Sequence, residues 1–214
     1  MWPTDSEGLI AALVQRGVDR ERGWYGGLIA TSNRLGNVDA SVLDKHGHLD
    51  LALHCSEPAV KILIWGHDGL SAWGCTTDLN VVAKVVMAWQ DGADGSALAD
   101  SQTCIHVGTE EEAIAEQWNF MLSQGFDYLQ DIAIPISEDP VLRRLRPWVS
   151  HGSLCLLLGN KPIGEDGRHL AFHDLGRGLW WLNVGGSLET YSGMSKEAAI
   201  ALASRLASSW ITER

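Results

Sequence analysis

The residues best suited to chemistry lie close together, between positions 143 and 151 of the chain. His151 carries an imidazole, which can take up or release a proton near neutral pH. Arg143 and Arg146 precede it, and a guanidinium binds a carboxylate or phosphate through paired N–H donors. This spacing predicts a site in which His151 is a general acid or base while Arg143 or Arg146 binds an anionic group. The alternative is structural pairing of these arginines with the glutamates at 110–112, and we favour it over ligand binding.

Tryptophan is unusually frequent, with 10 residues against 3 phenylalanines and 3 tyrosines. An indole combines a large apolar surface with one N–H donor, which suits a core and the wall of a wet pocket equally well. We therefore predict Trp73, Trp148 and Trp181 as ligand-binding residues, with core packing as the alternative.

Two His-Asp pairs, His67-Asp68 and His173-Asp174, each come before tryptophans and a helix-like run. Adjacent residues on a strand point to opposite faces, so the Asp is poorly placed to orient its neighbouring imidazole. An Asp at a turn more often accepts a hydrogen bond from its own backbone. We interpret both segments, 67–69 and 173–176, as turns between two strands rather than as catalytic dyads.

Other histidines offer only weak metal or nucleophile patterns. His46 and His48, joined by His54, could present imidazoles on one face, but Gly47 indicates a turn and no Cys or carboxylate stands at ligand spacing. We therefore expect no metal and no cofactor. The alternation of Cys104 and His106 is typical of a buried strand with a hydrogen-bonded His, rather than of a Cys-His dyad.

Hydrophobic periodicity predicts the elements that position these residues. Four helices are expected over 5–17, 78–89, 109–124 and 195–210, each preceded or begun by a residue that can cap it. The segment 132–140 is predicted as extended and 141–145 as a helical turn ended by Pro147. Strands are expected over 38–43, 49–55, 61–65, 70–73, 103–107, 154–158, 168–172 and 179–184.

Strands joined by short turns and followed by single helices indicate an α+β fold with mostly antiparallel sheets and helices packed on the sheet faces. The pattern occurs twice, over about 38–92 and 150–212, which predicts two similar strand-hairpin-helix halves. We expect one compact unit over 1–214, with a helical middle segment, 109–147, joining the halves.

Composition limits the classes of partner. The 214 residues are 45% hydrophobic, enough for a sizeable core. The formal net charge of −11 repels phosphate backbones and anionic lipid, so we expect neither a nucleic-acid nor a membrane partner. The four cysteines, at 55, 75, 104 and 155, form no Cys-x-x-Cys pair, which favours thiols in a reducing compartment. Without a basic or apolar leader, the sequence favours a cytoplasmic location.

Three stretches carry a family resemblance. The first has Trp-Gly and Thr-x-Asp-Leu at 73–79 and continues to Trp-x-x-Gly at 89–92. The second is Pro-x-Leu-Arg-x-Leu-x-Pro at 140–147, and the third is Ser-His-x-x-Leu at 150–154. Together they resemble an uncharacterised actinobacterial family of natural-product-biosynthesis proteins, over roughly residues 40–190. The chain departs from that family after position 154, where the family has a more aromatic, Pro-rich strand. The resemblance implies a biosynthetic context and assigns no catalytic residue.

Three functions remain open at this point. The first is an accessory or binding protein in natural-product biosynthesis, which holds a small-molecule or peptide intermediate or a partner enzyme. The second is a cofactor-free cyclase or isomerase that uses His151 with Arg143 or Arg146. The third is an immunity or antitoxin-type protein, whose acidic face covers a basic toxin. A homodimer is compatible with each of them.

Overall fold

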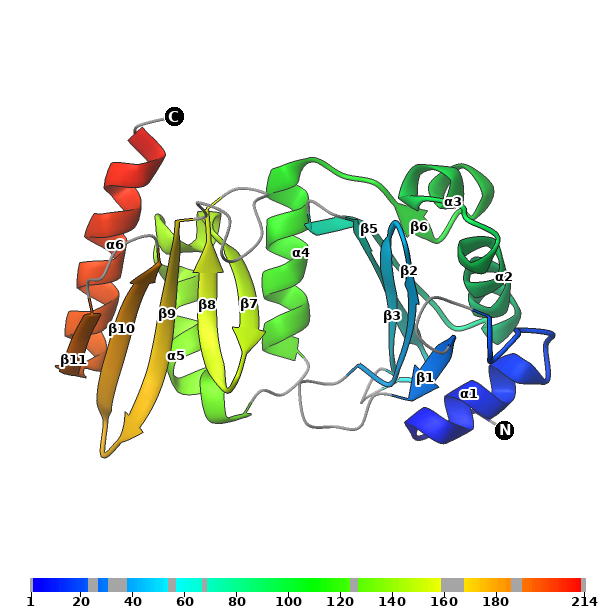
Figure 1. Cartoon of the computed structure of the whole chain (residues 1–214), viewed down its shortest axis with the longest axis horizontal. Helices are drawn as coiled ribbons and strands as arrows, with labels where there is room; N and C mark the ends of the chain where they lie inside the picture. Colours follow the sequence, from blue (N-terminus) through cyan, green and yellow to red (C-terminus); the bar gives the residue numbers. More distant parts are fainter. Residues whose placement is uncertain are drawn as a thin grey trace. The chain divides into compact units, whose positions relative to one another are not determined.

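The computed structural model describes residues 2–22, 27–30, 38–53, 57–66, 69–123, 127–158, 168–185 and 190–212. The chain divides into two compact units, Met1–Thr109 and Glu110–Arg214 (Figure 1). Within the described ranges, each unit runs from a helix through an antiparallel meander to a further helix, which confirms the predicted α+β class with two similar halves. The segment 109–147 supplies the first helices of the second unit, while one compact unit over 1–214 stays a prediction.

The first unit holds one sheet and three helices in its described part. Its elements are α1 (Ser6–Val14), β1 (Leu28–Ala30), β2 (Ala40–Asp44), β3 (Gly47–Leu53), β4 (Val60–Gly66), β5 (Gly69–Thr76), α2 (Leu79–Gln90), α3 (Gly95–Ser101) and β6 (Ile105–His106). The strands are ordered β1-β2-β3-β4-β5-β6, and each pairs antiparallel with its neighbour. The helix starts agree with the predicted caps, because Asp5 accepts from the Gly8 N–H at 2.7 Å and Asp78 from the Asn80 N–H at 2.8 Å.

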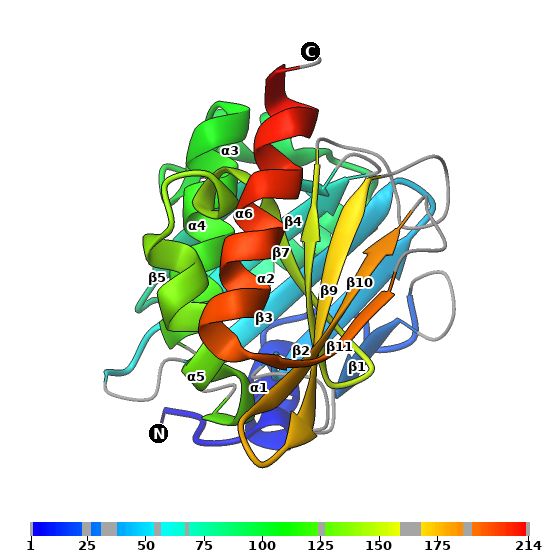
Figure 2. The same ribbon diagram turned by 90° about the vertical axis from the view of Figure 1, so that its left-hand side faces the viewer.

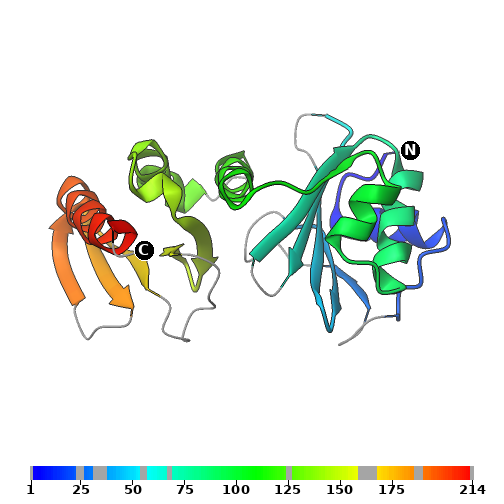
Figure 3. The same cartoon turned by 90° about the horizontal axis from the view of Figure 1, so that it is seen from above.

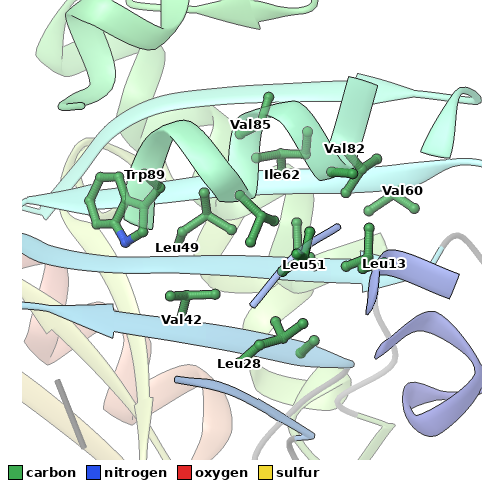
Figure 4. Packing of buried hydrophobic residues seen from close by; sticks show 14 of the residues in the cluster. Leu13, Leu28, Val42, Leu49, Leu51, Val60, Ile62, Val82, Val85 and Trp89 are labelled. Atoms are coloured by element: carbon green, nitrogen blue, oxygen red, sulfur yellow. The ribbon is translucent and has the colours of Figure 1, made fainter. Parts of the chain in front are cut away.

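The helices of the first unit cover one face of its sheet (Figure 4). Val82, Val85 and Trp89 lie on the buried face of α2 and pack with Leu49 and Ile62 of the sheet. These valines have low helix propensity, so packing must stabilise α2. Burying each such side chain contributes about 1.5–3 kcal/mol, more than the propensity loss of under about 1 kcal/mol per residue.

The second unit has the same plan with an additional helix before the meander. Its described elements are α4 (Glu110–Ser123), α5 (Asp127–Glu138), the 3₁₀ turn η1 (Leu142–Arg144), β7 (Arg146–Ser150), β8 (Ser153–Leu157), β9 (His169–Gly176), β10 (Leu179–Gly185), β11 (Thr190–Ser195) and α6 (Lys196–Thr212). The sheet order is β11-β10-β9-β8-β7. Helices α5 and α6 lie along one face of this sheet (Figures 2 and 3). Ala199, Ala203 and Ala207 face the sheet from α6, and these small side chains allow the helix to approach closely.

The prediction that 132–140 is extended is wrong, because residues 132–138 belong to α5 and residues 139–140 form the bend and turn that follow it. The alternation of apolar residues around Pro135 is typical of a strand, and proline usually interrupts a helix. In the structure Leu129, Ile132 and Ile136 are buried at helical spacing in the core of the second unit. Burial of this face outweighs the hydrogen bond that Pro135 cannot donate.

The prediction of a turn at 173–176 is also wrong, because His173 and Asp174 lie on β9. The turn comes later, at Arg177 and Gly178, which have positive φ angles of 57° and 73°. Asp174 does bind its own backbone, accepting from the Gly176 N–H at 2.7 Å. The other pair, at 67–68, lies outside the described residues, but β4 and β5 pair up to Gly66 and Gly69 on either side of it. The predicted hairpin between these strands is therefore confirmed.

Two further differences concern short elements. Helix α3 follows the predicted turn at 92–95, where Asp94 accepts from the Ala97 N–H at 2.9 Å and caps it. The strand predicted over 103–107 shrinks to β6, and His106 is exposed rather than buried. No helix in the described ranges is long and apolar enough to cross a membrane.

Candidate functional site

A groove with a volume of about 830 Å³ lies in the second unit, between α4 on one side and α5, η1 and α6 on the other. We call it the α4 groove. Its described lining comprises Glu110, Glu111, Ile114, Ala115, Trp118, Asn119, Leu122, Ser137, Pro140, Arg143, Arg144, Leu158 and Ile211. The α4 residues recur at intervals of one helical turn, so a single face of this helix forms one wall.

Trp118 fixes the position of that wall. Its side chain is buried, and its Nε1–H donates to the backbone oxygen of Leu145 at 3.1 Å. Leu145 directly follows η1, so this bond ties α4 to the opposite wall of the groove. A buried indole without this acceptor would leave its N–H unsatisfied, which makes the position of α4 specific. Trp118 is not among the site residues predicted from the sequence, because its helical spacing is also typical of a core position.

The opposite wall is ordered around Asp139. Its carboxylate accepts from the backbone N–H groups of Val141 and Leu142, at 2.9 Å each, and from Ser204 Oγ of α6 at 3.2 Å. These bonds hold the backbone of η1, which carries Arg143 and Arg144. The arginines are therefore presented from a fixed turn rather than from a loose loop.

The two walls carry opposite charge at the mouth of the groove. Glu110 and Glu111 are exposed in the first turn of α4, and Arg143 and Arg144 are exposed on η1. In the part of the chain that the structure describes, neither arginine lies within 4.0 Å of a carboxylate oxygen. Neither Arg143 nor Arg144 therefore forms the favoured pairing with the glutamates at 110–112, and both guanidiniums remain available to a ligand.

Three other predicted residues share a different surface, the face of the second sheet that points away from α5 and α6. Arg146 and Trp148 are two positions apart on β7, so their side chains point to the same face of the sheet. Trp181 lies on β10. Trp181 stacks on His173, with ring centroids 4.7 Å apart, and His173 Nδ1 is hydrogen-bonded to Ser153 Oγ at 2.5 Å. Burial lowers the pKa of His173, which favours a neutral ring that accepts this bond.

His151 lies in the tight turn between β7 and β8. Its φ is 51° and that of Gly152 is 78°, the left-handed conformations of a two-residue hairpin turn. The exposed imidazole accepts or donates one hydrogen bond, with Ser150 Oγ at 2.9 Å. Arg146 begins the same strand that ends at Ser150, so His151 lies five positions further on, roughly 16 Å along an extended chain. The structure therefore does not bring His151 together with Arg143 or Arg146.

The remaining candidates belong to the first unit. Trp73 is half-buried on β5, with its ring edge-on to His106 at a centroid distance of 4.9 Å. His46 packs on Trp89, whereas His48 lies 3.5 Å from the Asp50 carboxylate, so the two imidazoles have different neighbours. No group of three or more His, Cys, Asp or Glu side chains with metal-binding geometry occurs among the described residues, and His54 is outside them.

Comparison with known proteins adds no relative: no family model matches the chain, and neither a curated protein nor a solved structure matches it.

Proposed function

We propose that this protein is a binding protein that holds an amphipathic small molecule or short peptide in the α4 groove. The observation that carries the proposal is the combination of an apolar floor with two exposed arginines that lack a carboxylate neighbour among the described residues. The family resemblance supplies the context, in which the ligand is an intermediate of natural-product biosynthesis and the protein is an accessory factor.

The lining determines which ligand chemistry fits. Arg143 and Arg144 favour a carboxylate, which a guanidinium binds with charge-assisted hydrogen bonds. The apolar side chains of Ile114, Trp118 and Leu122 on the α4 wall favour a ligand whose central part is apolar. The glutamates on the facing wall favour a cationic group, so a peptide with a free C-terminus and a free amino group matches both walls.

The alternative of a cyclase or isomerase finds less support. It requires His151 beside Arg143 or Arg146, and β7 separates these residues. Among the described lining residues of the α4 groove there is neither a His nor a Cys. A groove that offers apolar contact and fixed charges is better suited to holding a ligand than to moving a proton.

Calorimetric titration with trileucine and with its C-terminal amide tests the proposal. The free acid is expected to bind more tightly than the amide, because only the acid places a carboxylate at the arginines. A charge-assisted hydrogen bond contributes about 1.5–3 kcal/mol, so the expected ratio is roughly 10- to 150-fold.

Variants locate the binding site. Arg143→Gln combined with Arg144→Gln is expected to abolish the preference for the acid, whereas Arg205→Gln, an exposed arginine of α6 outside the groove, leaves it unchanged. Failure of both peptides to bind, or an acid preference that survives the double substitution, contradicts the proposal.

A further inference from the structure

Helix α4 presents two different stripes of side chains to the α4 groove. The first, the apolar stripe, consists of residues one helical turn apart, Ile114, Trp118 and Leu122. The second, the polar stripe, has the same spacing and consists of Glu111, Ala115 and Asn119. All side chains of the polar stripe are exposed, whereas those of the apolar stripe are buried or half-buried. The groove therefore offers apolar contact along one line and hydrogen bonds along the next.

The side-chain amide of Asn119 is a hydrogen-bonding group that the fold leaves unused. In the part of the chain that the structure describes, it forms no hydrogen bond with another residue. The uncharged polar neighbours in the lining are already engaged, because Trp118 Nε1–H donates to Leu145 and the Ser137 hydroxyl donates to the Ile134 carbonyl at 2.7 Å. Water solvates an exposed amide, so a ligand that covers Asn119 must replace those bonds or lose about 5- to 150-fold in affinity.

A peptide bond is the ligand group that best matches this amide, because each has an N–H donor and a C=O acceptor. The two groups can therefore form a pair of N–H···O bonds. A fatty acid also fits the apolar stripe, and its carboxylate can bind Arg143 or Arg144. It leaves the Asn119 amide and the Glu111 carboxylate covered without partners, so these two groups disfavour it.

The spacing along the polar stripe suits an extended main chain. Asn119 lies eight positions after Glu111, about 12 Å along the helix axis. An extended peptide rises about 3.3 Å per residue, so a peptide whose amino group binds Glu111 places its third or fourth peptide bond beside Asn119. Ala115 lies midway between them, and its small side chain lets the ligand main chain approach the helix closely.

We infer that the ligand of the α4 groove is an extended peptide of about five residues, whose main chain follows the polar stripe and pairs with the Asn119 amide. The inference rests on the proposed function, because it requires that the groove binds a ligand. Glu111 binds the N-terminal ammonium group, and Ile114 and Leu122 contact apolar side chains of the peptide. Asn119 recognises the main chain, which every peptide has, so the groove accepts different apolar sequences but rejects ligands without a peptide bond.

The test compares calorimetric titrations with decanoate and with a pentapeptide of alternating leucine and alanine. Both probes have a carboxylate and an apolar part, but only the pentapeptide has peptide bonds and an amino group, so it is expected to bind more tightly. Asn119→Leu is expected to lower the ratio of the two affinities about 10-fold, the equivalent of one net hydrogen bond. Leucine has a higher helix propensity than asparagine, so α4 is retained. Ser123→Leu, an exposed position of α4 outside the groove lining, is the matched control and keeps the wild-type ratio.

Methylating one peptide nitrogen of the pentapeptide at a time locates the bond that Asn119 binds. Methylation at the third or fourth bond is expected to weaken binding to the wild type most, and this additional loss is expected to disappear in Asn119→Leu. An unchanged affinity ratio in Asn119→Leu overturns the inference. Decanoate that binds as tightly as the pentapeptide, while the Arg143→Gln and Arg144→Gln double variant still weakens both, overturns the inference and leaves the proposed function standing. Failure of both probes to bind overturns the two together.

Discussion

Replacing Trp118 by Phe tests whether the buried indole positions the wall of the α4 groove. The change removes the Nε1–H that donates to Leu145 and leaves that carbonyl buried, since Leu145 is only 1% exposed. An unsatisfied buried acceptor costs about 1–3 kcal/mol, and losing roughly two methylene equivalents of buried surface costs about 0.8 kcal/mol each. The expected loss in the free energy of unfolding is therefore about 3 kcal/mol.

Urea denaturation followed by circular dichroism measures this loss. With a denaturant slope of about 1–3 kcal/mol per molar, the midpoint is expected to fall by about 1–3 M. Trp148→Phe is the matched control, because Trp148 is 39% exposed and its replacement should cost about 1 kcal/mol or less. Hydrogen exchange should locate the loss of protection in α4. Equal midpoints for Trp118→Phe and the wild type, or equal losses for both variants, would refute the reasoning.

Three further predictions concern other parts of the fold. Gly74→Ala brings a Cβ against the Cys104 backbone oxygen, so hydrogen exchange of the β6 amides is expected to rise while β2–β4 keep their protection; unchanged β6 exchange contradicts this. Asp139→Ala removes the carboxylate that accepts from the Val141 and Leu142 N–H groups, and it is expected to cost about 1–3 kcal/mol in denaturant unfolding and to weaken trileucine binding. Asp174→Ala, on an exposed strand end, is expected to change neither. Burial holds the pKa of His173 below its unfolded value, so its neutral form stabilises the fold above about pH 6.5 and this stability is lost as the pH falls. His173→Gln should reduce the pH dependence of unfolding by up to one bound proton, and an identical pH profile would contradict the assignment.

Local signals predicted the helix starts because capping is a local interaction. Asp5 and Asp78 cap their helices through backbone N–H groups two or three residues away, and Ser195 accepts from the Ala198 N–H at 3.3 Å. The error over 132–140 has the opposite origin. Its alternating apolar residues and internal Pro135 are locally ambiguous, and only the core against which Ile132 and Ile136 pack decides for a helix.

The difference between local and long-range contacts also explains which of the predicted site residues lie together in the structure. Arg143 was predicted from charge and position alone, and it does line the α4 groove. The partner chosen for it, His151, is near in sequence, but an extended strand separates the two residues in space. The residues that do share the groove with Arg143 come from distant segments, such as Ile114 and Ile211. Sequence proximity therefore misleads when a strand lies between two residues, because a strand maximises the distance that each residue adds.

The repeated His-Trp association has a structural basis that differs from the His-Asp pattern of the sequence. In the first unit His48 of β3 lies opposite Trp65 of β4 and stacks on it, with ring centroids 5.5 Å apart. In the second unit His173 of β9 lies opposite Trp181 of β10 and stacks on it in the same way. In both units the pair joins the third and fourth strands of the meander, on the sheet face away from the helical core. In the second unit Asp174 contributes nothing to the stack, because it follows His173 directly on β9 and points to the other face. The relation between the two halves is thus one of cross-strand pairs, which a reading of consecutive residues does not detect.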